Sequence, residues 1–196
     1  WFGGSETGDA VADVLFGKIT PSGKLTTTFP RSVGQLPLFY NHLNTGRPDP
    51  DSRMFNRYAS NYLDESNEPL YPFGYGLSYT DFVYGELQIS SETLPKNGEL
   101  TVSVTVTNKG NYDGYETVQL YLRDIYAEVA RPMKELKGFE RIFLKSGESR
   151  DVKFVITKDD LKFYNSELHY VYEPGEFDVM VGPNSRDVQT KSFQAE

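Results

Sequence analysis

The sequence has no cysteine and only two histidines, His42 and His169. Without cysteine the chain has no disulfide, no thiolate nucleophile and no sulfur ligand for zinc. The two histidines lie far apart along the chain, and we interpret both as surface or packing residues. We therefore expect no metal and no cofactor.

Long apolar runs and excess positive charge are also missing. No stretch reaches the roughly 18 apolar residues that a membrane span needs, so we expect no membrane partner. No basic-then-apolar leader opens the sequence, and we place any export signal outside it or in a removed segment. The net charge is −8 and the lysines and arginines are scattered. A phosphate backbone would be repelled, which argues against a nucleic-acid partner.

The chain has enough apolar residues to build a core. Its 196 residues include 38% apolar residues, among them 14 tyrosines and 13 phenylalanines. This length suits one full domain plus a fragment, or two small domains. Large rings of this kind favour pleated, half-buried surfaces, which points to β-structure.

Residues 1–30 predict one helix and one short strand. The helix lies within "GSETGDAVADVLFGK", with Ser5 as its N-cap and Gly17 at its end. The strand is "KLTTTFP". Helical spacing predicts one buried apolar face, made of Ala10, Val11, Val14 and Leu15.

Residues 31–67 show no sustained period and are rich in Asn, Asp, Pro, Arg and Tyr. A plain linker would contain fewer aromatic residues, so we expect this segment to lie against another surface. The rings concerned are Phe39, Tyr40, Phe55, Tyr58 and Tyr62.

The stretch "LYPFGYGLSYTDF", residues 70–82, mixes rings with glycines. We predict that Gly74 and Gly76 let the backbone pass close to another surface. The rings then join two parts of the protein; a sugar-binding platform is the alternative, which the interleaved glycines disfavour. They are Tyr71, Phe73, Tyr75, Tyr79 and Phe82.

Residues 83–196 predict an immunoglobulin-like or fibronectin III-like β-sandwich, so the fold class is mainly β. About seven short strands are expected, four of which alternate apolar and polar residues, and they are separated by turn signals such as "PKNGE" and "EPGE". One helical turn is expected in "TKDDLKFYN", capped by Thr157 or Asp159. The predicted inward residues are Leu100, Val102, Val104, Val106, Val118, Leu120, Leu122, Val152, Phe154, Ile156, Phe177, Val179 and Val181.

Several motifs, in order, resemble the C-terminal third of family 3 glycoside hydrolases, the β-glucosidase group. They are "DAVADVLFGKITPSGKLTTTFP", "YPFGYGLSYTDF", "VTVTNKGNYDGYETVQLYLRD", "RPMKELKGFERIFLKSGES" and "EPGEFDVMVG". "PRSVGQLPLFYNHLNTGRP" is similar to the periplasmic bacterial branch. The resemblance implies three parts. Residues 1–30 are the C-terminal end of an α/β sandwich domain, residues 31–82 are a linking segment and inter-domain hinge, and residues 83–196 form a fibronectin III-like domain.

The same resemblance implies a non-catalytic region of an exo-acting β-glucosidase. The family's nucleophilic aspartate and its acid/base carboxylate come before the matching region, and neither motif is found here. Retaining hydrolysis needs two carboxyl groups about 5–5.5 Å apart. The close pairs here, Asp49 with Asp51, Asp64 with Glu65, and Asp159 with Asp160, lie in polar stretches that would not raise a carboxyl pKa. Whether the chain alone is an enzyme stays uncertain.

One loop is a candidate for touching substrate. Asn41, Asn44 and Arg47 carry the amide and guanidinium donors that sugar hydroxyls need, next to the ring of Tyr40. Hydrogen bonds between domains are the alternative role.

Two other functions stay open at this stage: a self-standing carbohydrate-binding or adhesive sandwich, and the same region of a β-xylosidase. The partners implied are the catalytic domains of the same protein and, through them, an oligosaccharide. Exposed apolar residues near the start, such as Val11 and Leu25, also predict self-association. The resemblance implies a periplasmic or secreted location.

Overall fold

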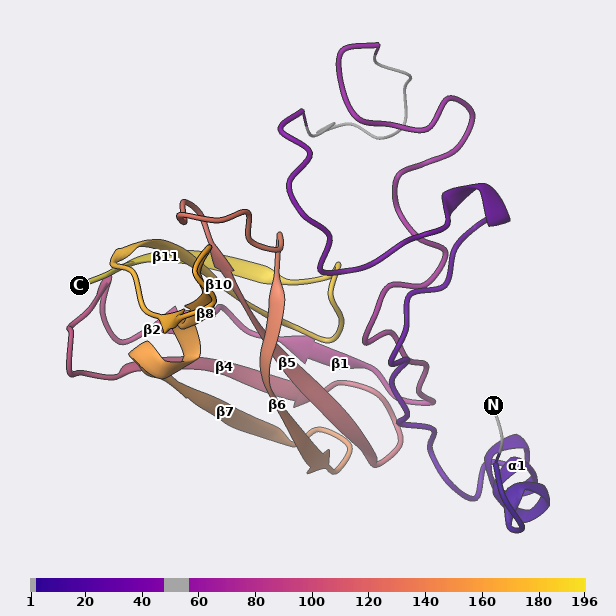
Figure 1. Cartoon of the computed structure of the whole chain (residues 1–196). Coiled ribbons are helices and arrows are strands. Elements are labelled where there is room, and N and C mark those ends of the chain that lie inside the picture. The colour runs from indigo at the N-terminus through magenta and orange to yellow at the C-terminus, as the bar shows by residue number, and fades with distance from the viewer. Residues whose placement is uncertain (1–2, 48–56) are drawn as a thin grey trace.

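The computed structural model describes residues 3–47 and 57–196. Two β-sheets pack face to face, and the first third of the chain lies along one side and one end of them (Figure 1). The elements are α1 (Thr7–Leu15), η1 (Val33–Gln35), β1 (Phe82–Tyr84), β2 (Gln88–Ile89), β3 (Thr93–Leu94), β4 (Leu100–Asn108), β5 (Gly114–Asp124), β6 (Glu135–Leu144), β7 (Ser149–Ile156), η2 (Lys158–Leu161), β8 (Phe163–Tyr164), β9 (Tyr170–Val171), β10 (Gly175–Gly182) and β11 (Gln189–Ala195).

The first sheet is built around β4. Strand β7 pairs antiparallel with β4 from Leu100 to Thr107, and β1 and β2 pair with β4 at separate positions. The second sheet has the order β3-β11-β10-β5-β6. All its pairs are antiparallel except β3 with β11, and the pairing of β5 with β6 shifts register between Leu120 and Tyr121. The short strands β8 and β9 form a separate hairpin.

The core lies between the two sheets and confirms the predicted β-sandwich. In β4 the four alternate residues Leu100, Val102, Val104 and Val106 are at most 3% exposed, as the alternation predicted. The other predicted inward residues are buried too, except Phe154, which is half-buried against the cluster. Thr157 accepts a hydrogen bond from the Asp159 amide and caps η2, as expected.

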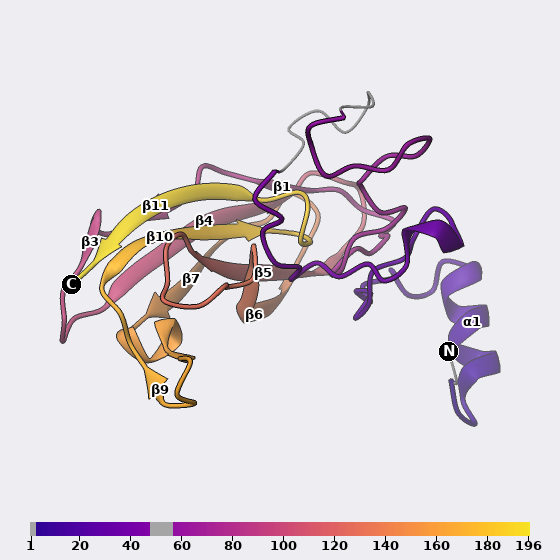
Figure 2. The ribbon, with the colours of Figure 1, turned by 45° about the horizontal axis from the view of Figure 1, so that its top comes forward.

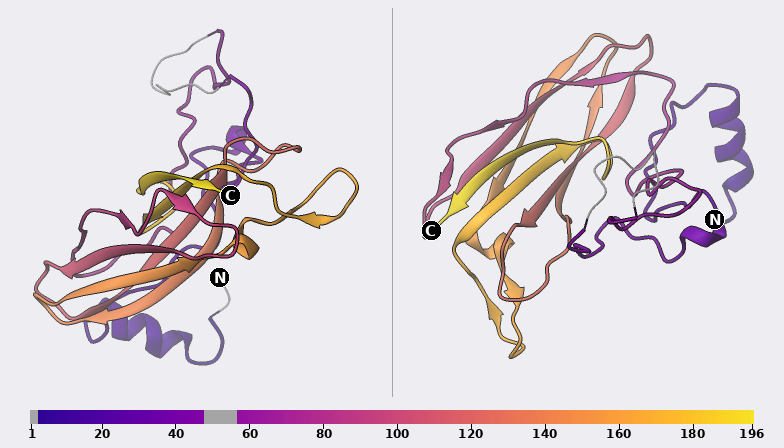
Figure 3. Two further views of the ribbon diagram at one scale, coloured as in Figure 1. Left: turned by 90° about the vertical axis from the view of Figure 1, so that its left-hand side faces the viewer. Right: turned by 90° about the horizontal axis from the view of Figure 1, so that it is seen from above.

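Helix α1 lies at the end of the molecule opposite the C-terminus (Figures 2 and 3). Its predicted N-cap is wrong: the helix begins at Thr7, and the flanking residue Glu6 makes no side-chain cap. Gly17, with a φ of 74°, adopts the left-handed conformation that was expected at the helix end.

The predicted burial of the helix face is also wrong. No residue of α1 is buried, and Val11 and Leu15 are 51% and 72% exposed. The helical spacing of the apolar residues is correct, but Val11 and Leu15 stay exposed and Val14 is only half-buried.

The predicted strand "KLTTTFP" is not a regular strand. Only Phe29 forms a bridge, with Tyr71, although Leu25 exchanges backbone hydrogen bonds with Tyr75 and Gly74. The facing stretch contains Pro72, which has no amide proton, so a continuous ladder is not possible there.

Residues 31–35 and 62–68 are held together by the buried side chain of Gln35. Its Oε1 accepts a hydrogen bond from the Arg31 amide at 2.6 Å, and its Nε2 donates to the carbonyl of Ser66 at 2.8 Å. The hydroxyl of Tyr62 donates to the Gln35 carbonyl. The irregular segment therefore has polar interior contacts of its own. Phe55, one of its predicted rings, lies outside the described residues.

Candidate functional site

The hinge segment crosses the outer face of the five-stranded sheet at Gly74. The amide of Gln119 in β5 donates to the carbonyl oxygens of Gly74 at 3.1 Å and Pro183 at 2.7 Å. A Cβ on Gly74 would lie 2.0 Å from Gln119 Oε1, and the φ of Gly74 is 80°. The predicted close approach of the glycine backbone to another surface is therefore confirmed.

The aromatic rings of this region pack on one another between the chain segments. Tyr40 stacks on Phe73, with ring centroids 4.3 Å apart, and meets Tyr121 edge-on at 5.9 Å. Tyr71 stacks on Tyr75 at 4.9 Å. Burial raises the pKa of the Tyr121 hydroxyl above its usual range. These contacts favour the joining role of the rings over a sugar platform, because the stacked faces are already occupied.

The segment after Tyr40 is fastened to the loop between β5 and β6. The amide of Met133 donates to the carbonyl of His42 at 2.8 Å, and Leu43 forms an antiparallel bridge with Pro132. The sandwich thus holds the backbone of the segment that carries the candidate substrate residues.

Those candidates, Asn41, Asn44 and Arg47, all lie exposed on that one stretch. The structure does not gather them in a single cavity. Asn41 lines a hollow of about 570 Å³ beside Thr26–Thr28 and Phe39, whereas Asn44 lines a different hollow of about 290 Å³ formed with the β5–β6 loop. The Oδ1 atom of Asn44 accepts a hydrogen bond from the Gly46 amide at 3.0 Å. That leaves its side-chain amide group as the donor a sugar could use.

A third hollow, of about 220 Å³, lies between the linking segment and the sandwich, and its lining includes three charged residues. Lys134 donates to the Ser185 carbonyl at 2.6 Å, and burial lowers the pKa of its ammonium. Glu68 and Arg186 also line this hollow. No pattern in the sequence predicts that these residues meet, because they come from three separate segments that only the fold brings together.

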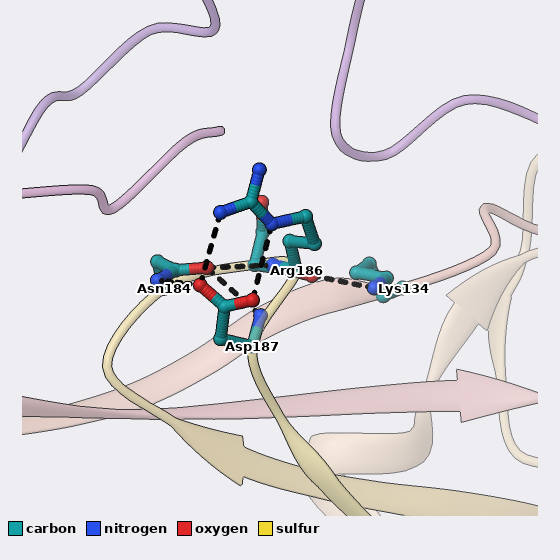
Figure 4. A network of polar contacts seen from close by, with 5 residues as sticks. Lys134, Asn184, Arg186 and Asp187 are labelled. Atoms are coloured by element: carbon teal, nitrogen blue, oxygen red, sulfur yellow. Dashed lines mark hydrogen bonds and ion pairs between the residues drawn. The ribbon is translucent and has the colours of Figure 1, made fainter. Parts of the chain in front are cut away.

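Side-chain hydrogen bonds hold the turn that carries Arg186. Asn184 Oδ1 accepts hydrogen bonds from the backbone amides of Arg186 and Asp187, and the guanidinium of Arg186 donates to the Asp187 carboxylate (Figure 4). The Arg186 hydrogen bond lowers the pKa of the Asp187 carboxyl. Because the carboxylate offsets this arginine, the hollow is not a strong anion site.

A buried ion pair joins residues 1–30 to the sandwich. The ammonium of Lys24 lies 2.8 Å from Glu116 Oε1 of β5, and the Tyr84 hydroxyl donates to the same oxygen at 3.2 Å. Burial and then the charge of Glu116 raise the pKa of Tyr84 far above its usual value. A buried charge pair of this kind requires both partners, so the two segments are fixed to each other.

Asp159 and Asp160, one of the carboxylate pairs considered from sequence, have structural roles. Asp160 accepts the Thr157 amide in a capping box, and a hydrogen bond from Lys162 lowers the pKa of Asp159. Asp49 and Asp51 lie outside the described residues. Among residues 3–47 and 57–196, no three acidic or histidine side chains are placed to hold a metal ion. In the same ranges no helix is long and apolar enough to span a bilayer.

The fold and these contacts define a fibronectin III-like β-sandwich to which the first part of the chain is fastened. Residues 116–185 match the model of the fibronectin type III-like domain. Residues 1–79 match the glycosyl hydrolase family 3 C-terminal domain. The chain belongs to the family 3 glycoside hydrolases, as their C-terminal region.

Known proteins match nearly the whole length of this chain in sequence and in structure. It is 52% identical to a periplasmic beta-glucosidase of Salmonella typhimurium, over 99% of this chain and 25% of that protein. It is 46% identical to a beta-xylosidase of Formosa agariphila, over 98% of this chain and 26% of that protein. The beta-glucosidase of Listeria innocua, solved in complex with glucose, superposes with a TM-score of 0.91 at 46% identity, over 100% of this chain and 27% of that one. The chain thus spans about a quarter of the length of these relatives.

Proposed function

We propose that this chain is the non-catalytic C-terminal region of an exo-acting β-glucosidase, which removes terminal β-D-glucosyl residues when complete. In that protein the sandwich braces the catalytic domains. The proposed divisions are residues 1–30 as the end of an α/β sandwich domain, residues 31–82 as link and hinge, and residues 83–196 as the fibronectin III-like domain.

The observation that carries this proposal is the attachment of residues 1–30 to β5 through a buried ion pair and to Asp113, just before β5, through a hydrogen bond. Lys24 pairs with Glu116, and Thr20 donates to the Asp113 carbonyl at 2.9 Å. On the other side of the same segment, α1 leaves its apolar residues uncovered. A part that is fixed to the sandwich on one side and apolar on the other fits a joint between the sandwich and a larger domain.

Asn41, Asn44 and Arg47 are proposed to face the sugar from this joint. All three are exposed, and the sandwich fixes their backbone through His42 and Leu43. A role in hydrogen bonds to the catalytic domains is the alternative for the same donors.

The test is hydrolysis of p-nitrophenyl β-glucoside and β-xyloside by this chain and by the complete reading frame. We expect turnover of the glucoside by the complete protein and none by the chain. Turnover by the chain alone would contradict the non-catalytic role. A clear preference of the complete protein for the xyloside would select the β-xylosidase reading, which the Formosa agariphila relative supports.

A self-standing carbohydrate-binding or adhesive module is the remaining alternative. It predicts glycan binding by the chain alone, which affinity electrophoresis on soluble glucans would reveal. We further propose a periplasmic or secreted location, on the strength of the periplasmic relative. Fractionation of cells that produce the complete protein tests this location.

A further inference from the structure

The outer face of the five-stranded sheet is covered at one end and open at the other. At the covered end, Gln119 and Tyr121 lie beneath Gly74 and Tyr40. At the open end, Tyr115 is 40% exposed and Phe143 37%; Phe139, which pairs with Gln119 but lies on the edge strand β6, is 64% exposed. Together with Arg141 they form the surface that we name the aromatic patch.

The aromatic patch is pre-ordered by its own contacts. Tyr115 and Phe143 are paired across β5 and β6, with ring centroids 5.0 Å apart. The guanidinium carbon of Arg141 lies 3.7 Å from the centre of the Tyr115 ring, and its Nη2 donates to Ser22 Oγ at 3.2 Å. Side chains held in this way lose little conformational freedom when a partner covers them.

The charge of Arg141 is unmatched within the described part of the chain, where it forms no ion pair with a carboxylate. Exposed aromatic rings around an arginine are the composition of energetically dominant interface residues. A partner that fits this surface presents apolar side chains to the rings and one carboxylate to the guanidinium.

The position of the aromatic patch points to its occupant. Its rim is made by the first part of the chain: Tyr115 lines a small hollow with Pro21 and Leu77. Helix α1 is tied to the same region, because the Tyr79 hydroxyl donates to the Val14 carbonyl at 2.7 Å. The relatives carry about three times the length of this chain outside the match, and residues 1–79 match a domain described as C-terminal, so a portion outside the match is expected to join at this helix.

We propose that the aromatic patch is the surface on which the preceding portion of the same polypeptide packs, with a carboxylate of that portion opposite Arg141. The proposal rests on the proposed function, in which the complete protein contains catalytic domains. It adds a direct contact between the sandwich and those domains, separate from the covalent hinge and from the uncovered face of α1.

Hydroxyl-radical footprinting of the complete protein tests the proposal, because it reports the solvent access of individual rings. Tyr164 and Tyr170 of the β8–β9 hairpin, 64% and 55% exposed, serve as internal references. We expect the three rings of the aromatic patch to be oxidised several-fold more slowly than these references. Equal oxidation rates would overturn the proposal.

A variant pair sharpens the result. Phe139→Ser combined with Arg141→Ala should restore oxidation of Tyr115 in the complete protein. Val155→Ser, at a residue 52% exposed on the other sheet, is the matched control and should leave Tyr115 protected. If Tyr115 stays protected in the double variant, a contact at the aromatic patch is not what covers it, and the proposal fails.

The footprinting experiment also distinguishes two other partners that could cover the aromatic patch. Protection that rises with protein concentration would mean a second copy, and protection that appears only with added β-glucan oligosaccharide would mean a glycan; either result overturns the proposal. Turnover of p-nitrophenyl β-glucoside is measured on the same sample. Turnover with unprotected rings refutes the docking surface alone, whereas protected rings without turnover of the glucoside refute the β-glucosidase activity alone.

Discussion

The ammonium of Lys24 and the carboxylate of Glu116 lie 2.8 Å apart, and their side chains are only 17% and 7% exposed. Lys24 belongs to the segment that follows α1, and Glu116 belongs to the sandwich strand β5. The pair therefore connects the two parts of the chain at a place that water hardly reaches.

Removal of one partner should cost more stability than removal of both charges. Lys24→Met leaves Glu116 as an uncompensated buried charge, and we expect a loss of about 3 kcal/mol in the free energy of unfolding. The double variant Lys24→Met, Glu116→Gln keeps an acceptor for the Tyr84 hydroxyl and should recover part of the loss. Urea unfolding measures both; a double variant less stable than Lys24→Met would contradict the argument.

The close approach at Gly74 is tested by comparison with Gly147. Both glycines have a positive φ, 80° and 78°, but an added Cβ meets Gln119 at Gly74 and open space at Gly147. Gly147→Ala should lose about 1 kcal/mol from backbone strain alone. Gly74→Ala should lose roughly 1–3 kcal/mol more, because the buried hydrogen bonds of Gln119 are displaced. Equal losses in urea unfolding would mean that the contact with Gln119 contributes nothing.

Two variants of Asn44 distinguish a hydrogen bond to the sugar from a structural role in the turn. Asn44→Asp keeps the acceptor for the Gly46 amide and removes the side-chain donor, whereas Asn44→Ala removes both. If the donor binds sugar in the complete protein, both variants should raise KM for a β-glucoside several-fold and leave kcat nearly unchanged. Normal kinetics in Asn44→Asp would assign Asn44 to the turn only.

Arg47→Ala is expected to raise KM in the same assay. Arg150→Ala, at an exposed arginine of β7 that pairs with Glu148, is the control and should behave as the unmodified protein. Equal KM values in the two variants would remove Arg47 from the candidate site.

Ionisation of the Asp124 carboxyl group should lower the free energy of unfolding as the pH rises. Burial, opposed by the charge of Arg131, raises the pKa of Asp124 above its ordinary value of 3.8. The folded state then binds the proton more tightly than the unfolded state, so stability decreases as pH rises from about 4 through the folded pKa. Asp124→Asn removes this pH-dependent loss of stability. We expect its free energy of unfolding to improve relative to the unmodified chain as the pH rises above about 4, in urea titrations at several pH values. The opposite trend would mean that Arg131 outweighs burial.

The chain alone should self-associate through the uncovered apolar residues near its start. Leu15 and Phe16 are 72% and 89% exposed. Sedimentation velocity at increasing concentration should show a dimer or larger species, and Leu15→Ser with Phe16→Ser should shift the chain to a monomer. A monomeric unmodified chain at all concentrations would contradict this prediction.

Local patterns in the sequence determined most of the sandwich. The alternation in β4 predicted its buried residues because in a strand successive side chains point to opposite faces. Gly17 and Thr157 occupy helix-end positions that depend on neighbouring residues only. The rings and glycines of residues 70–82 likewise indicate a tight junction, which the contact of Gly74 with Gln119 forms.

Tertiary structure decided the rest. The burial of α1 was predicted wrongly, because helical spacing reports an apolar face and not whether anything packs on it. The meeting of Lys134 with Ser185, and of Lys24 with Glu116, depends on pairings between distant segments that no local pattern contains. The sequence by itself determined which residues form strands and turns, since those choices follow backbone geometry and alternation. The joint and its charges arise only when the folded sheets bring separate segments within hydrogen-bond distance.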